Sequence, residues 1–209
     1  MKNEKTYRAA FAQSREKIAR LAPEEIGRRS LYRYDTTSQH FEMTSLGQAF
    51  SVSYPDASIR WANAEQDVPM DWALVLLNYL SSAKEIPIAG EWLTYRQLPS
   101  GQVFYGNLER YTLKELSTWY AQCNPNQLRA ALSKTQCMVV HASADLNIQI
   151  DFTPRVPVLL QFWDGDEDMP ASSQILFDRT AAEQIHIEDL AVVCGIIKRW
   201  VMRAYSSLD

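Results

Sequence analysis

Hydrophobic residues recur at helical spacing in three parts of the chain. Residues 3–22 place apolar side chains every three or four positions, which predicts an amphipathic N-terminal helix. Residues 70–84, MDWALVLLNYLSSAK, are almost wholly apolar but too short to span a bilayer, so they predict a core helix. Residues 187–205 show the clearest period, with acidic residues first and basic residues last. They predict a long C-terminal amphipathic helix.

Between these helices the pattern changes to that of strands. Residues 31–62 are short aromatic and β-branched runs broken by turn formers, which predicts a meander of three or four strands. Residues 90–112 contain two strand-like runs around LPSG. This predicts a hairpin with Pro99 at a turn corner and Gly101 at a positive φ. Residues 137–166 predict three strands, of which VPVLLQFW is buried on both faces or central.

The order of the elements indicates the fold class. Residues 113–124 and 125–136 predict two more helices, the second opening with a proline in its first turn. No repeat, low-complexity segment or linker interrupts the chain, and strands and helices never alternate in βαβ order. We therefore expect a single α+β domain over residues 1–209, with mostly antiparallel sheet and packed helices.

Composition and charge exclude several classes of protein. A net charge of −4 and a pI of about 5.5 argue against a nucleic-acid-binding protein, which needs clustered Lys and Arg. The cysteines are odd in number and lack Cys-x-x-Cys spacing, which predicts reduced thiols, a cytoplasmic location and no cluster held by this chain alone. The sequence contains no glycine-rich phosphate loop, no serine elbow and no zinc-type pair of histidines. We expect no membrane segment and no metal site, and the oligomeric state stays open.

The stretch QFWDGDEDMPASSQILFD, residues 161–178, concentrates the candidate chemistry. Four carboxylates stand among residues 164–168, directly after a buried strand. A calcium loop of the common kind requires a glutamate at its twelfth position, but counting from Asp164 gives Ile175. Two interpretations remain open. The carboxylates of Asp166 and Asp168 could act as an acid and a base if they were desolvated. Alternatively, the segment is a solvated turn.

Asp178 ends the same stretch and also has two interpretations. It could cap the helix that follows, although TAAE at residues 180–183 forms a capping box that competes for this role. It could instead be a buried, paired carboxylate. Removing a cap costs about 1 kcal/mol of stability, and removing one partner of a buried pair costs much more.

Two long segments resemble a known family. VLLQFWDGDEDMPASSQILFD, followed by IHIEDLAVV, is similar to the C-terminal signature of the domain of unknown function 3786 family. LLNYLSSAKEIPIAGEWLTYRQLPSGQVFYGNLER resembles its helix, Gly-Glu-Trp and Pro-x-Gly segment. The resemblance covers about residues 65–195, within a family-like core of about residues 65–205. It implies prokaryotic, largely anaerobic hosts and an association with iron–sulfur modules or with corrinoid and one-carbon metabolism. It transfers no catalytic residue.

The resemblance adds weight to three patches as one candidate site. Their residues are Trp92 and Arg96, the turn Pro99–Gly101, and Trp163, Asp164, Gly165, Asp166 and Glu167 with Asp178. The leading hypothesis is a non-enzymatic binding or accessory protein of anaerobic metabolism. It would bind a corrinoid or other tetrapyrrole, or an iron–sulfur or corrinoid protein partner. Apolar walls would come from Trp92, Tyr95, Phe104 and Trp163.

Two alternatives belong to other classes of protein. The first is an enzyme that uses Asp166, Glu167 or Asp178 as a general acid or base. The second is a structural interaction protein whose acidic loop is solvated surface.

Overall fold

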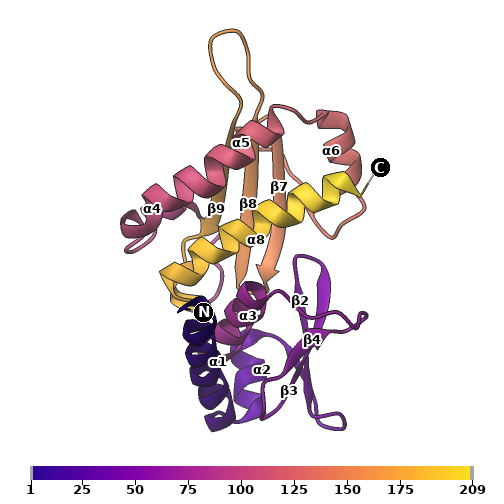
Figure 1. Ribbon diagram of the computed structural model, residues 1–209, viewed down its shortest axis with the longest axis vertical. Coiled ribbons are helices and arrows are strands. Elements are labelled where there is room, and N and C mark those ends of the chain that lie inside the picture. Colours follow the sequence, from indigo (N-terminus) through magenta and orange to yellow (C-terminus); the bar gives the residue numbers. More distant parts are fainter. Residues whose placement is uncertain (1, 208–209) are drawn as a thin grey trace.

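The computed structural model describes residues 2–207, and the side chains of residues 7–207. Two antiparallel sheets stand one above the other in Figure 1, with helices beside them. The first sheet has the order β1 (Arg33–Asp35), β2 (His40–Ser45), β3 (Gln48–Ser53) and β4 (Ile59–Trp61). The second has the order β5 (Trp92–Thr94), β9 (Ser172–Asp178), β8 (Val156–Trp163), β7 (Leu146–Thr153) and β6 (Met138–Val139).

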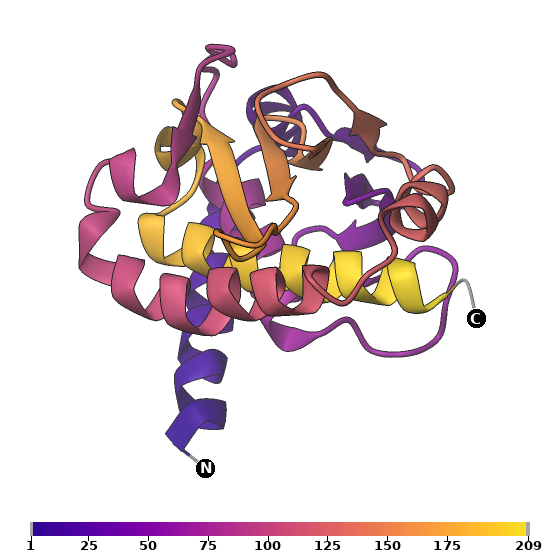
Figure 2. The ribbon, with the colours of Figure 1, turned by 90° about the horizontal axis from the view of Figure 1, so that it is seen from above.

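The helices fall into two groups. Next to the first sheet lie α1 (Lys2–Arg20), α2 (Pro23–Ser30) and α3 (Met70–Ser82). The second group comprises α4 (Gln102–Leu108), α5 (Lys114–Tyr120), α6 (Pro125–Leu132), α7 (Ala181–Gln184) and α8 (Ile187–Ser206). Figure 2 shows α8 and the α4–α5 helix running side by side along one face of the second sheet. A π-helical turn, Glu109–Leu113, joins α4 to α5.

The predicted fold class is confirmed, and so are most of the predicted elements. The N-terminal, central and C-terminal helices form as α1, α3 and α8, and the meander forms as β1 to β4. β8 occupies the centre of its sheet, and seven of its residues are buried, which confirms a strand covered on both faces.

The hairpin predicted around LPSG is wrong. Only Trp92–Thr94 is a strand, and after a 3-10 turn at Tyr95–Gln97 and the LPSG turn the chain enters α4. Three buried residues, Leu108, Leu116 and Tyr120, are spaced by eight and four positions. They form one buried stripe along the helices of this segment. Its aromatic and β-branched residues suggested strands, but the stripe packed against the sheet decides in favour of a helix.

One hydrophobic cluster continues through both sheets. It includes Phe41 and Phe50 of the first sheet, Tyr79 of α3, and Phe152 and Phe162 of the second sheet. α3 is buried along most of its length, as its sequence predicts. The two sheets therefore share a core, and the chain forms a single α+β domain.

The β2–β3 hairpin also connects the sheets and prepares the site described below. Its turn uses Leu46 and Gly47, both at positive φ, and the backbone N–H of Leu46 donates to the carbonyl of Asp151 in β7 at 3.1 Å. A Cβ on Gly47 would lie 3.2 Å from the Cβ of Gln136, so the turn packs closely on the segment after α6. Within the described chain, no helix has the length and apolar character needed to cross a membrane.

Candidate functional site

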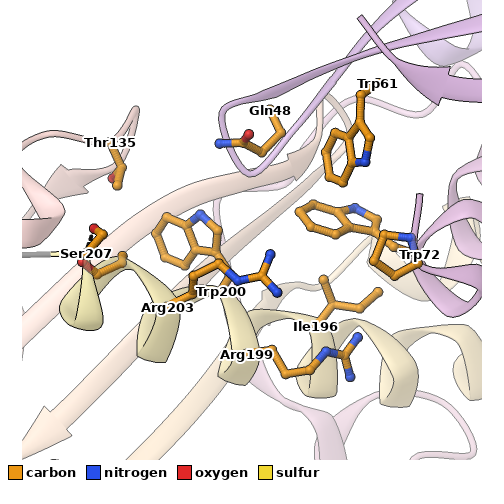
Figure 3. A pocket seen from close by; sticks show the side chains of 11 residues that line it. Gln48, Trp61, Trp72, Thr135, Ile196, Arg199, Trp200, Arg203 and Ser207 are labelled. Atoms are coloured by element: carbon orange, nitrogen blue, oxygen red, sulfur yellow. Dashed lines mark hydrogen bonds between the residues drawn. The ribbon is translucent and has the colours of Figure 1, made fainter. Parts of the chain in front are cut away.

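A cavity of about 290 Å³ lies where the first sheet, the start of α3 and the end of α8 meet. We call it the tryptophan cleft, because the rings of Trp61, Trp72 and Trp200 border it (Figure 3). Its other lining residues are Gln48, Pro69, Thr135, Ile196, Arg199, Arg203, Ala204 and Ser207. The lining is mainly apolar with a few polar groups, which is typical of a small-molecule site.

Two of the tryptophans form a rigid aromatic corner. Trp61 ends β4 and stacks on Phe50, with ring centroids 4.5 Å apart and an interplanar angle of 28°. Trp72, in the first turn of α3, stands at 89° to Trp61 with centroids 5.6 Å apart. Its indole N–H donates to the buried hydroxyl of Ser45 at 2.9 Å. The rings are therefore held in place by packing and a hydrogen bond, so binding would require little rearrangement.

α8 supplies the opposite wall. Ile196, Trp200 and Ala204 recur every four residues and so share one face of the helix with Arg199 and Arg203. Ile196 is buried and Trp200 is only 9% exposed. Figure 3 shows the indole nitrogen of Trp200 turned toward the side of the cavity where Gln48 lies.

The two arginines of the cleft differ in their partners. Arg199 donates to the carboxylate of Asp71 at 2.6 Å, which ties α8 to the start of α3. The guanidinium of Arg203 has no acidic partner among the residues that the structure describes. Pro69 precedes the first turn of α3, whose N-terminal end adds a partial positive charge on the same side. The cleft therefore has a positive rim around an apolar interior.

The lining offers binding groups rather than reactive ones. Gln48, Thr135 and Ser207 carry neutral groups that can donate or accept hydrogen bonds. The described lining contains no His, Cys, Asp, Glu or Lys, which are the usual acids, bases and nucleophiles. Across the described residues no group of three His, Cys, Asp or Glu side chains is arranged to hold a metal ion.

The candidate residues from the sequence lie outside the cleft and at two ends of the second sheet. Trp92 and Asp178 are register partners in β5 and β9. Trp163 pairs with Ser172 at the other end of β9, about 20 Å away at the usual rise per residue. The three patches therefore do not form one site.

Asp178 is buried, with 1% of its surface exposed, and closes a turn. Its carboxylate accepts hydrogen bonds from the backbone N–H groups of Ala89, Gly90 and Thr180, and from the hydroxyl of Thr180. Burial alone raises the pKa of this carboxyl, but the hydrogen bonds from Thr180, Ala89 and Gly90 outweigh burial, so its pKa is lowered overall. The predicted capping box is wrong, because Thr180 makes no side-chain cap and donates to Asp178 instead.

The patch around Arg96 is also structural. The Arg96 guanidinium lies over the ring of Tyr105, 5.5 Å from its centroid. Gly101 has φ −61° rather than the predicted positive φ, and Ser100 takes the left-handed conformation. A Cβ at Gly101 would lie 1.9 Å from the carbonyl oxygen of Tyr95, so close packing requires this glycine. The proposed wall residue Tyr95 is buried and donates its hydroxyl to the carbonyl of Ile187.

The acidic loop at residues 164–168 is an exposed, internally bonded turn. Asp166 accepts from the backbone N–H groups of Asp168 and Met169 at 2.9 and 2.7 Å. The carboxylate of Asp164 accepts a hydrogen bond from the hydroxyl of Tyr120. The pKa of the Tyr120 phenol is raised, mainly by burial and next by this bond. The carboxylates thus have the geometry of a solvated turn, and the desolvation that acid–base chemistry requires is lacking.

Gly165 has a packing role in the same loop. A Cβ on this residue would lie 2.7 Å from the backbone nitrogen of Ala171, so the returning chain leaves no room for a side chain. The structure agrees with the solvated turn, one of the two interpretations that the sequence left open, whereas the cleft follows from no motif in the sequence. The one local signal for it is the pattern Arg199, Trp200 and Arg203, which places basic and aromatic residues together near the end of an amphipathic helix.

Comparison with known proteins gives one match. A family model described as Domain of unknown function (DUF3786) matches residues 22–200, a range that includes all three tryptophans of the cleft and ends before Arg203. No curated protein and no solved structure gives a match to the chain.

Proposed function

The chain belongs to the DUF3786 family, and from the tryptophan cleft we propose that it is a non-enzymatic binding protein for a small molecule with a flat, apolar body. One observation carries this proposal. Three tryptophans from three separate elements converge on one mainly apolar cavity, and two of them are held in fixed orientations. Aromatic pairs contribute about 0.5–1.5 kcal/mol beyond the burial of area, so a flat ring gains most from such walls.

The size of the cavity limits the ligand. An apolar cavity of about 150 Å³ is enough to bind benzene. The tryptophan cleft has about twice that volume, at about 290 Å³, and so suits two fused rings. A corrinoid or porphyrin ring is larger and would enter only with one edge or one side group.

The chemistry of the lining favours binding over catalysis. Among the described lining residues the only charged groups are Arg199 and Arg203, and guanidinium groups are poor general acids and bases. The nearest carboxylate, Asp71, is paired with Arg199. An enzyme that uses the loop at residues 164–168 stays an alternative, and so does a structural interaction protein. The bonds within the loop favour the second of these for that segment.

The experiment uses the six tryptophans of the chain as reporters. The neutral probe 1-naphthamide is titrated into ¹⁵N-labelled protein, and the indole N–H signals are followed by NMR. We expect the signals of Trp61, Trp72 and Trp200 to shift. Trp92, Trp119 and Trp163 lie outside the cleft and serve as internal controls. Movement of Trp92 and Trp163 alone, or of no signal, would refute the proposal.

A variant that blocks the cleft distinguishes binding in the cleft from nonspecific binding. Ala204→Phe adds a ring inside the cleft, whereas Ser206→Phe adds the same ring to an exposed position outside it. We expect Ala204→Phe to abolish the shifts and Ser206→Phe to retain them, with both variants folded by circular dichroism.

The wider expectations remain proposals. Anaerobic cofactor metabolism, a corrinoid or other tetrapyrrole, and an iron–sulfur or corrinoid protein partner are each compatible with a binding protein. Titration with cyanocobalamin and hemin under the same conditions distinguishes them from a small flat ligand. A response of Trp92 and Trp163 would support the patches derived from the sequence, and no response at any indole would reject the corrinoid and heme forms.

A further inference from the structure

We infer that the ligand of the tryptophan cleft carries an oxyanion, a carboxylate or phosphate group, that pairs with Arg203 and accepts the indole N–H of Trp200. The inference rests on the proposed function and specifies its ligand class. It comes from two groups on the same face of α8, three residues apart.

Trp200 contributes an indole N–H that borders the cavity, keeps access to solvent and has no acceptor among the described residues. The side chain is only 9% exposed, and its N–H makes no hydrogen bond within the described chain. The other two tryptophans of the cleft are satisfied: Trp72 donates to Ser45 at 2.9 Å, and Trp61 donates to the carbonyl of Asp67 at 3.4 Å. An unpaired donor on the wall of a mainly apolar cavity is one of the few polar groups that can orient a ligand there, so we assign to it an acceptor on the ligand.

Arg203 contributes an uncompensated positive charge. Arg199, one turn earlier on α8, is neutralised by Asp71, whereas Arg203 has no carboxylate partner among residues 7–207. Figure 3 draws its guanidinium turned toward the cavity. Counting Arg199, Asp71 and Arg203 together leaves one positive charge at the cleft. A guanidinium binds carboxylates and phosphates through two parallel hydrogen bonds, so either of these is a matching group.

The two walls of the cleft fit different parts of the ligand. The aromatic corner of Trp61 and Trp72 receives the flat body, and the α8 wall receives the anion. The first turn of α3 faces the same cavity and adds its partial positive charge. The expected ligand is therefore a ring system of about two fused rings with one acidic substituent, such as an aromatic carboxylate or an aryl phosphate ester.

The test compares three probes that share one ring system. They are 1-naphthoate, 1-naphthyl phosphate and the neutral 1-naphthamide, and their affinities are measured by calorimetry and by the indole NMR signals. Wild-type protein should bind at least one anionic probe about tenfold more tightly than the amide, and added salt should weaken only the anions. The order of the two anions identifies the acidic group.

Three variants assign the effect to residues. Arg203→Gln should reduce the preference for the anion to less than about twofold, and Arg203→Lys should retain part of it. Trp200→Phe keeps an aromatic side chain, although a smaller one, and removes the donor; it should weaken anion binding by about threefold to tenfold. Arg96→Gln removes an arginine outside the cleft and should change nothing.

The outcomes separate the inference from the proposed function. If the amide binds as tightly as both anions, or if Arg203→Gln leaves the preference intact, the anionic ligand is overturned while the binding protein stands. If none of the three probes binds, the proposed function fails, and the inference fails with it.

Discussion

Replacement of Asp178 by alanine tests whether this residue is a helix cap or a buried anchor. The carboxylate accepts from three backbone N–H groups and one hydroxyl, at distances between 2.6 and 3.1 Å. The residue is 1% exposed, so these bonds form in a largely dehydrated setting. Asp178→Ala removes all four hydrogen bonds. The end of β9 is then no longer bonded to the 89–90 segment or to Thr180.

The magnitude follows from two opposing effects. Hydrogen bonds to a charged group contribute about 1.5–3 kcal/mol each, but removing the carboxylate also relieves the cost of burying its charge. Ala89 and Gly90 lie in an exposed segment, where water can replace the lost acceptor. We therefore expect a loss of about 3 kcal/mol in the free energy of unfolding. A residue that acted only as a helix cap would cost about 1 kcal/mol.

The dependence on pH gives a second readout. The pKa of Asp178 is lowered in the folded protein, so its contribution is fully present above the unfolded pKa of about 3.9. The contribution disappears as the pH falls through the folded pKa. The difference in stability between wild type and Asp178→Ala should therefore be constant from neutral pH to about pH 5 and shrink at lower pH.

Urea unfolding at several pH values measures both effects. The matched control is Asp166→Ala, which removes a carboxylate that also accepts from two backbone N–H groups but lies in an exposed loop. We expect this control to cost less than about 1 kcal/mol. Equal losses for the two variants, with unchanged m-values, would refute the account of Asp178 as a buried anchor.

Two further predictions concern packing and helix ends. Gly101→Ala should lower stability by about 3 kcal/mol, because its Cβ would lie 1.9 Å from the carbonyl oxygen of Tyr95. The matched variant Gly106→Ala adds a Cβ in open space on α4 and should raise stability by about 0.5–1 kcal/mol. Thermal unfolding measures both, and a stable Gly101→Ala protein would contradict the close contact. Arg155→Lys should cost about 2 kcal/mol, because the buried guanidinium donates to carbonyls at the end of α2 and at residue 86, and an ammonium group cannot reach them all. Urea unfolding tests this prediction, and a loss below about 0.5 kcal/mol would refute it.

Local pattern was enough to predict much of the fold. The stripes of α1 and α8 and the continuous apolar runs of α3 and β8 follow from periodicity, because each element must bury one face or all of its surface. The turn at Pro99–Gly101 was also identified correctly as a turn. The reason given for Gly101, a positive φ, was wrong. The glycine is required because the carbonyl oxygen of Tyr95 lies close to it, and only the folded backbone creates that contact.

Polar residues were harder to interpret, because their setting depends on the other parts of the chain. Asn147 occupies a polar position in the alternating run LNIQIDF, a pattern typical of a strand with one exposed face, yet it is buried and accepts a hydrogen bond from Gln161 on the neighbouring strand. Asp178 and the acidic loop share one stretch of sequence, but β9 separates them, so one is a buried anchor and the other is solvated surface.

The sequence by itself determined the α+β class, most of the elements and the family resemblance, because these depend on residues that are near one another in the chain. The tryptophan cleft was decided by the tertiary structure alone. Its walls come from positions as distant as Gln48 and Ser207, and they meet only because α8 packs beside α3 and the first sheet. Six tryptophans look alike in the sequence. Packing determines which three face a common cavity and which of these three indole N–H groups is left without an acceptor.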